Sequence, residues 1–284
     1  EIGGGFRIPS IMEQSGANLV EIGSTNRTYI YDYEKAVNAS TGALLKVHAS
    51  NFRITGFTSE ASLGEIVELG RRNSIPVIHD LGSGCLIDTS LHGLPHEFTP
   101  QESIQLGSDI VLFSGDKLLG GPQSGIILGK THLIAEMASH PLARALRIDK
   151  VNLAALTATL MHYVNDEAVQ KIPIWRMILM SVEEIKTRAQ AWQSEVGEVS
   201  VVVEGESTIG GGSLPGETLA TWLLAVDSRG IKVSIEKFTD RLRGLPYPVI
   251  ARVEKDRVLF DPRTVSPSDD RVLLESIKGA LEVP

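Results

Sequence analysis

The sequence has only one cysteine, Cys85, in 284 residues. A single thiol excludes an internal disulfide framework and favours a reducing compartment, so we expect a cytoplasmic protein. Cys85 follows an apolar run and is interpreted as a structural thiol, with chemical reactivity as the alternative. The apolar runs stay well short of the ~18 residues of a membrane span, and no secretory signal pattern is visible. We therefore expect no membrane partner.

Basic residues are in the minority, with 27 Lys and Arg against 35 Asp and Glu, and the net charge is -8. This balance argues against a broadly basic RNA-binding surface, although it leaves room for local basic patches. The few histidines and the lone cysteine do not cluster, so we expect no metal site. The hydrophobic share of 42% is enough to build one large domain and one smaller domain.

The first half of the chain alternates short apolar runs with amphipathic stretches. This alternation predicts an α/β domain in which helices cover both faces of a mostly parallel sheet. A strand-like run at 19–22 comes first. Further strands are expected at 44–49, 76–81, 109–114 and 125–129, and helices at 32–37, 62–73 and 132–139.

The pattern changes after a long helical zone at 149–163 and 174–196, which Pro173 interrupts. Short apolar runs at 201–203, 220–226, 249–253 and 258–260 then predict an antiparallel sheet. Helices at 234–243 and 268–281 are expected to pack on it. We therefore predict a large domain over residues 1–170 and a small α+β domain over residues 171–284.

One glycine-rich segment carries the clearest chemical signal: Ser114-Gly-Asp-Lys-Leu-Leu-Gly-Gly-Pro-Gln-Ser-Gly125. It follows a buried strand and delivers Lys117 at the strand end. A lysine amine there can form a Schiff base with an aldehyde such as that of pyridoxal 5'-phosphate (PLP). Ser114 stands three residues earlier, near enough to hold the cofactor phosphate. The alternative is a surface lysine on a tight turn. The segment is no P-loop, because Lys117 precedes the Gly-Gly pair.

Two earlier strands also end in polar residues. The run Pro76-Val-Ile-His-Asp80 ends at Asp80, and a carboxylate there can keep the pyridine nitrogen of PLP protonated. The run before it ends in His48 and Asn51; Asn51 can hydrogen-bond the phenolic oxygen of the cofactor. His48 is either a second cofactor contact or a core histidine. The carboxyl ends of parallel strands collect ligands, so these residues are expected to meet Lys117.

The ordered set Asn51, Asp80 and Lys117 resembles the fold-type I PLP-dependent enzymes. Several segments narrow the resemblance to bacterial selenocysteine synthase, the L-seryl-tRNA(Sec) selenium transferase family: Gly23-Ser-Thr-Asn-Arg-Thr28, Lys46-Val-His-Ala-Ser-Asn51, Asp80-Leu-Gly-Ser-Gly84, the Lys117 segment, His140-Pro-Leu-Ala-Arg-Ala-Leu-Arg-Ile-Asp-Lys150 and Gly210-Gly-Gly-Ser-Leu-Pro215. The similarity covers about the later three-fifths of the family's chain, so we expect the amino-terminal part to be missing.

The resemblance implies PLP as cofactor, with Lys117, Asp80, Ser114, Asn51 and His48 binding it. It also implies that seryl-tRNA(Sec) loses its β-hydroxyl and receives selenium from selenophosphate. In the implied reaction Lys117 first removes the Cα proton while Asp80 stabilises the pyridinium; the β-hydroxyl leaves after that, and selenium adds last. The family's chains form homo-oligomers, rings of dimers, and we expect the same here.

The resemblance further assigns Arg144 and Arg147 to the selenium donor, and Ser24 and Thr25 to the substrate pocket. Three residues apart on a helix, the two arginines share a face and can grip a tetrahedral anion. The alternative for them is a solvated helix face. Arg263 is expected to be structural or to face the tRNA, and the loop 210–215 can approach the cleft or be an ordinary turn.

Two other functions stay open from the sequence. One is a related PLP-dependent lyase or aminotransferase that acts on a small amino acid. The other is an inactive core fragment that only oligomerises. Both alternatives leave the predicted fold unchanged.

Overall fold

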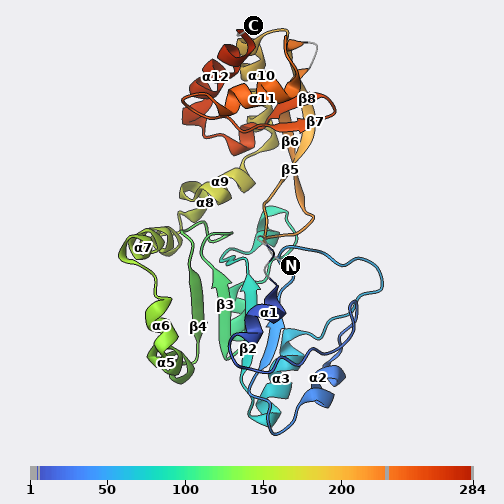
Figure 1. Cartoon of the computed structure of the whole chain (residues 1–284), viewed down its shortest axis with the longest axis vertical. Coiled ribbons are helices and arrows are strands. Elements are labelled where there is room, and N and C mark those ends of the chain that lie inside the picture. Colours follow the sequence, from blue (N-terminus) through green and yellow to red (C-terminus); the bar gives the residue numbers. More distant parts are fainter. Residues whose placement is uncertain (1–4, 6, 228–229, 283–284) are drawn as a thin grey trace. The chain divides into compact units, whose positions relative to one another are not determined.

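The computed structural model describes residue 5, residues 7–227 and residues 230–282 of the chain (Figure 1). Its contacts divide these residues into two compact units. The first comprises the described residues up to Ala168 together with Gly210–Gly216, and the second comprises Val169–Ile209 and the described residues from Glu217 onward. The placement of Gly210–Gly216 with the first unit differs from the expected continuous second domain. Among the described helices, none combines the length and apolar character needed to cross a membrane.

The first unit is built on a four-stranded sheet of order β1-β2-β3-β4 (Figure 1). Strands β1, β2 and β3 run parallel, and β4 is antiparallel to β3. The α/β prediction with a mostly parallel sheet is therefore confirmed. The strands are β1 (Leu44–Val47), β2 (Val77–Gly82), β3 (Ile110–Ser114) and β4 (Gly125–Gly129); the helices are α1 (Ile8–Glu13), α2 (Ile30–Ala36), α3 (Leu63–Asn73), α4 (Pro100–Gln105), α5 (Thr131–Ser139), α6 (Pro141–Ala145) and α7 (Lys150–Val164), with a 3-10 turn at Thr89–His92.

Helix α3 shows how the sequence starts one of these elements. The Ser62 hydroxyl accepts from the Glu65 backbone amide, while the Glu65 carboxylate accepts from the Ser62 amide. This reciprocal capping box satisfies amides that the first turn leaves unpaired. The helix then buries Ile66 and Leu69 in a cluster with Val77 of β2, which anchors the start of that strand.

One expected element is wrong. The apolar run 19–22 forms no strand, because it has no partner ladder in the described part of the chain. The ladder contacts of this region are single bridges that join Ser24 to Arg27 and Arg27 to Ser59. An apolar run alone does not make a strand when no neighbouring strand supplies the hydrogen bonds.

Two buried polar side chains lie in or beside β2. His79 is 1% exposed, and its Nδ1 lies 3.0 Å from the Ser103 hydroxyl, which itself donates to the Thr99 carbonyl. Nδ1–H is therefore the donor. Burial first, and then the positive charges of Lys46 and His48, lower the pKa of His79 to about 4. The imidazole is neutral at physiological pH.

Cys85 is fully buried, and its thiol donates to the Ile87 carbonyl at 3.0 Å. Burial raises the pKa of the Cys85 thiol to about 12. Because the thiolate is the reactive form, this cysteine is inert in the folded chain. The structural interpretation of Cys85 is thus favoured over the reactive one.

The second unit has a four-stranded sheet of order β5-β6-β8-β7 in which every neighbouring pair is antiparallel. The chain passes from the first unit to the second within α8. The strands are β5 (Ser200–Thr208), β6 (Thr218–Asp227), β7 (Arg252–Glu254) and β8 (Arg257–Phe260); the helices are α8 (Ala168–Lys171), α9 (Pro173–Leu179), α10 (Val182–Val196), α11 (Ile235–Arg243) and α12 (Asp270–Glu282), with 3-10 turns at Pro262–Thr264 and Pro267–Asp269. This confirms the predicted α+β character.

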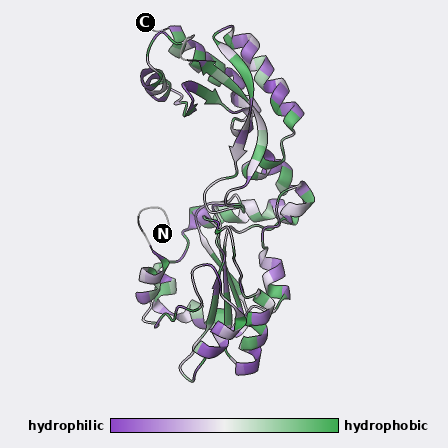
Figure 2. Ribbon diagram, turned by 90° about the vertical axis from the view of Figure 1, so that its right-hand side faces the viewer, coloured by the Kyte–Doolittle hydropathy of each residue, from purple (hydrophilic) through white to green (hydrophobic). Residues whose placement is uncertain are grey.

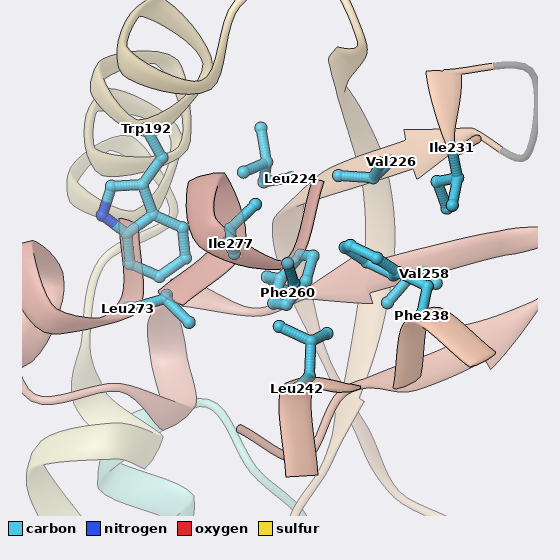
Figure 3. Close-up of a cluster of buried hydrophobic side chains, with 11 residues drawn as sticks. Trp192, Leu224, Val226, Ile231, Phe238, Leu242, Val258, Phe260, Leu273 and Ile277 are labelled. Atoms are coloured by element: carbon cyan, nitrogen blue, oxygen red, sulfur yellow. The ribbon is translucent and has the colours of Figure 1, made fainter. Parts of the chain in front are cut away.

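The core of the second unit lies between this sheet and three helices (Figure 3). Trp192 of α10, Phe238 of α11 and Ile277 of α12 meet Leu224 and Phe260 from the strands. Full burial of each such side chain stabilises the fold by about 1.5–3 kcal/mol. Figure 2 shows that the helices carry hydrophilic residues as well as hydrophobic ones, as expected for helices with one buried side.

Arg263 is a structural residue of this unit. It is only 4% exposed, and its guanidinium donates to the carbonyls of Met177, Ile178 and Met180 at the end of α9. Its second amino group donates to the Ala220 carbonyl of β6 at 2.6 Å. Cationic donors are favourable at a helix carboxyl terminus, so Arg263 ties α9 to the sheet. Of the two expected roles, the structural one fits its position.

We predict that Arg263→Met lowers the free energy of unfolding of the second unit by roughly 3–5 kcal/mol, because several buried carbonyls lose a charged donor. All three tryptophans, Trp175, Trp192 and Trp222, lie in this unit, so tryptophan fluorescence during urea unfolding reports on it. Arg243→Met is the matched control, since Arg243 is exposed and pairs with Asp240 at the surface. A loss below about 1 kcal/mol for Arg263→Met would contradict the structural role.

Candidate functional site

The site is set by the carboxyl ends of the parallel strands. Val47 of β1 lies opposite Asp80 of β2, and Asp80 lies opposite Leu112 of β3. The His48 amide donates to the Asp80 carbonyl at 2.8 Å. His48 and Asp80 are therefore neighbours at one edge of the sheet, and Lys117 follows β3 by three residues at the same edge.

The backbone around Lys117 is held by the core of the first unit. Leu118 and Leu119 are 1% and 0% exposed. The Leu118 amide donates to the Ser83 carbonyl at 3.0 Å, and the Tyr163 hydroxyl of α7 donates to the Leu119 carbonyl at 2.8 Å. Two buried leucines thus fix the chain directly after Lys117, while the lysine side chain itself is half-buried at the ends of the strands.

The amine of Lys117 lies beside a glycine, Gly82, at the end of β2. A Cβ atom built on Gly82 would lie 3.6 Å from Lys117 Nζ and 2.9 Å from Ser50 Oγ. Gly82 also has a φ of 68°, which favours glycine. Ser50, Gly82 and the lysine amine therefore surround a space that a side chain at position 82 would fill. Ser50 is a site residue that the sequence analysis did not assign.

Asp80 is the carboxylate of this site. Its Oδ1 accepts from the Gly82 amide at 3.1 Å. Burial raises the pKa of Asp80 above its ordinary value, although the Gly82 hydrogen bond and the positive charges of Lys117 and His48 act in the opposite direction. The net direction shows that these groups do not fully compensate its desolvation. A carboxylate in this state favours a further cationic partner.

A second carboxylate lies close to the His48 imidazole. Glu97 is 2% exposed, and its Oε1 lies 3.5 Å from His48 Nε2. Neither atom has a hydrogen-bond partner in the described structure, so a small rotation would satisfy both. Glu97 is the other residue that sequence reasoning missed, because it stands in a loop with no motif around it.

Other predicted residues lie at the surface. Asn51 is exposed in the segment after β1, whereas its neighbour Ser50 faces Gly82. Ser24 and Thr25 are exposed in a turn where the Ser24 hydroxyl donates to the Arg27 carbonyl at 3.0 Å. Ser114 is the half-buried last residue of β3, so it ends at the same sheet edge as Asp80.

The arginine pair differs from the expected helical arrangement. Arg144 is on α6, but this helix ends at Ala145, and Arg147 lies in the irregular segment before α7. Asp149 then caps the next helix, α7, by accepting from the amides of Val151 and Asn152. The prediction that Arg144 and Arg147 share a helical face is therefore wrong. Both side chains are exposed.

We predict that Asp80→Asn stabilises the ligand-free chain at pH 7, because it removes a carboxylate whose burial is not fully compensated. The pKa of Asp80 is raised in the folded chain, so its protonated carboxyl contributes stability that is fully present below pH 3.8. This contribution is lost as the pH rises through the folded-state pKa. The difference between variant and wild type should vanish near pH 3.5, as thermal unfolding at several pH values would show. Equal stability at pH 7 would contradict this account of Asp80.

Comparisons with known proteins show which family the chain belongs to. The family model for L-seryl-tRNA selenium transferase matches residues 1–266. The chain is 48% identical over 288 residues to the L-seryl-tRNA(Sec) selenium transferase of Clostridium botulinum (strain Loch Maree / Type A3), an alignment that covers 99% of this chain and 62% of that protein. It is 49% identical over 285 residues to the Clostridium perfringens protein of the same name, covering 98% of this chain and 61% of that one.

Among solved structures, D-glucosaminate-6-phosphate ammonia-lyase superposes with a TM-score of 0.62 at 21% identity, over 96% of this chain and 66% of that chain. At this identity the likeness shows the fold, and it confirms the predicted fold-type I architecture. The chain spans about 62% of the length of the curated relative from Clostridium botulinum. Because the family model matches most of its residues, the chain belongs to the L-seryl-tRNA selenium transferase family.

Proposed function

We propose that this chain is the PLP-binding core of an enzyme that converts seryl-tRNA(Sec) to selenocysteinyl-tRNA(Sec) with selenophosphate. The observation that carries the proposal is the position of Lys117 Nζ at the sheet edge beside Gly82, on the same edge as the desolvated carboxylate of Asp80. The 48% identity to a relative of that named activity supports the same substrate class. We extend the proposal to a cytoplasmic homo-oligomer, a ring of dimers.

The residues of the site fit PLP. The space that a Cβ at Gly82 would fill lies against the amine of Lys117, which would hold the cofactor covalently. Asp80 would face the pyridine nitrogen, and Ser114 would hold the phosphate. His48 and Asn51 complete the proposed set. When bound, PLP supplies an electron sink for the breaking of bonds at the Cα atom of the seryl group.

Each protein group then has a defined task. The amine of Lys117 takes a proton from the seryl Cα, and its half-buried position limits competing solvation. The burial that raises the pKa of Asp80 also strengthens its attraction to a cationic ring nitrogen. After a small rotation Glu97, whose Oε1 lies 3.5 Å from His48 Nε2, would orient that imidazole.

The proposed donor site uses Arg144 and Arg147. Selenophosphate is a tetrahedral anion, and two guanidinium groups can each bind it with two parallel hydrogen bonds. The short irregular segment between α6 and α7 brings both arginines into one exposed stretch, although not onto one helical face. Ser24 and Thr25 remain proposed residues of the seryl-tRNA pocket.

We predict that incubation with PLP followed by borohydride attaches a phosphopyridoxyl group to the peptide that contains Lys117. Lys117→Ala should abolish this labelling, because the amine at the sheet edge is lost. Lys130→Ala is the control, since Lys130 pairs with Asp109 at the other end of β3 and should leave labelling unchanged. Peptide mass spectrometry gives the readout. Equal labelling of wild type and Lys117→Ala would refute the assignment.

We predict that replacing both Arg144 and Arg147 by alanine spares loss of the β-hydroxyl from seryl-tRNA and abolishes selenium incorporation. Each charged contact is worth about 1.5–3 kcal/mol, so donor affinity should fall by roughly two to four orders of magnitude. Replacement by lysine should restore only part of the affinity.

The two half-reactions are measured separately, with thiophosphate as a competing anion. The double alanine replacement of Arg271 and Arg243, two arginines of the second unit, is the control. Loss of the first half-reaction with unchanged donor binding would place Arg144 and Arg147 on the tRNA or in the fold. Elimination from free serine at a comparable rate would favour the small-amino-acid lyase instead.

A further inference from the structure

The loop Gly210–Gly216 connects β5 to β6, yet its contacts place it in the first unit. Three consecutive residues of the loop are buried: Gly212, Ser213 and Leu214. Ser213 is 4% exposed and Leu214 is 5% exposed. A glycine-rich connection normally lies at the surface. The burial of this loop therefore indicates that it packs against other residues of the first unit.

The loop covers the end of the Lys117 side chain. A Cβ atom built on Gly212 would lie 2.9 Å from Lys117 Cε, 3.0 Å from Nζ and 3.1 Å from Cδ. A Cβ built on Gly82 would lie 3.6 Å from the same Nζ. The lysine amine therefore lies between two glycine backbones that come from distant parts of the sequence. No larger residue fits at position 212 unless the lysine moves.

The backbone of the loop is held in an uncommon conformation. Gly212 has a φ of 82°, and Gly216 has a φ of 79°. Leu214 has a φ of 46°, which a residue with a side chain adopts only when its surroundings enforce it. Such local strain concentrates at functional sites, where surrounding contacts hold one geometry.

We propose that Gly212 is a positioning residue for Lys117: its backbone confines the amine to the side of Gly82, Ser50 and Asp80. This inference rests on the proposed function of Lys117 and adds a residue to it. A methyl group at position 212 would occupy the space of Lys117 Cε and Nζ. Because these atoms are the flexible end of a long side chain, the lysine would yield before the loop backbone does.

The test compares Gly212→Ala with Gly216→Ala. The two glycines have nearly equal φ, so both substitutions carry the same backbone strain. Only Gly212 has Lys117 beside it, since nothing lies within 4 Å of a Cβ at Gly216. Gly211→Ala is a further control, because a Cβ there also meets open space. We expect Gly212→Ala and Gly216→Ala to lower the melting temperature equally.

Two labelling measurements then separate the variants. In Gly212→Ala, the PLP concentration for half-maximal borohydride labelling of Lys117 should rise at least tenfold. In the ligand-free chain, acetylation of Lys117 by acetic anhydride, relative to Lys130, should become several-fold faster as the amine leaves its confined position. Gly216→Ala should match wild type in both. Opposite changes in the two reactions cannot come from general loss of structure.

Each outcome decides a specific claim. If Gly212→Ala and Gly216→Ala behave alike in both reactions, the positioning role is overturned. If wild type itself gives no PLP adduct at Lys117, the proposed function fails, while the acetylation contrast still judges the positioning role. If Gly212→Ala does not fold, the double variant Gly212→Ala/Lys117→Ala is tested, because it lacks the lysine side chain that the new methyl group would meet. Its stability must equal that of Gly216→Ala/Lys117→Ala. A lower stability also overturns the proposal.

Discussion

The parallel pairing of β1, β2 and β3 is the constraint on which the rest of the first unit depends. Parallel strands end at the same edge of a sheet, so the polar residues that follow these strands lie near one another. The register that sets Val47 against Asp80 also places the His48 amide on the Asp80 carbonyl. The buried leucines after Lys117 then add the amine to this edge.

The site also shows how a functional arrangement departs from the most stable one. Asp80 is desolvated without full compensation, and Leu214 has a strained backbone. Both features cost free energy in the ligand-free chain, and both lie in the unit that carries Lys117. Preorganised sites commonly retain such unfavourable groups because a bound partner relieves them. The uncompensated burial of Asp80 and the strained backbone of Leu214 therefore both support ligand binding at this edge of the sheet.

The sequence predicted strands close to β1, β2, β3 and β4 and their mostly parallel pairing, because apolar runs that end in polar residues are local signals, but its strand at 19–22 was wrong. It assigned a contact to Asn51 where the structure places Ser50 beside Gly82, since a one-residue difference in a loop depends on backbone angles. Glu97 was not assigned, because it stands in a loop with no motif around it. The sequence left open whether the loop 210–215 approaches the site, and the structure places its Gly212 beside Lys117. Arg147 lies outside α6, which ends at Ala145, so three-residue spacing did not place the two arginines on one helix.

The buried imidazole of His79 gives the sheet a thermodynamic sensitivity to acid. The unfolded chain binds a proton at this residue near pH 6.5, whereas the folded chain does so only near pH 4. The favourable contribution of the neutral ring is complete above pH 6.5 and disappears as the pH falls through this window, a loss of roughly 3 kcal/mol. Domains are stable by only about 5–15 kcal/mol, so this single proton is a substantial fraction. Storage or purification between about pH 4 and 6 would therefore lower the stability that the neutral His79 ring contributes to this unit.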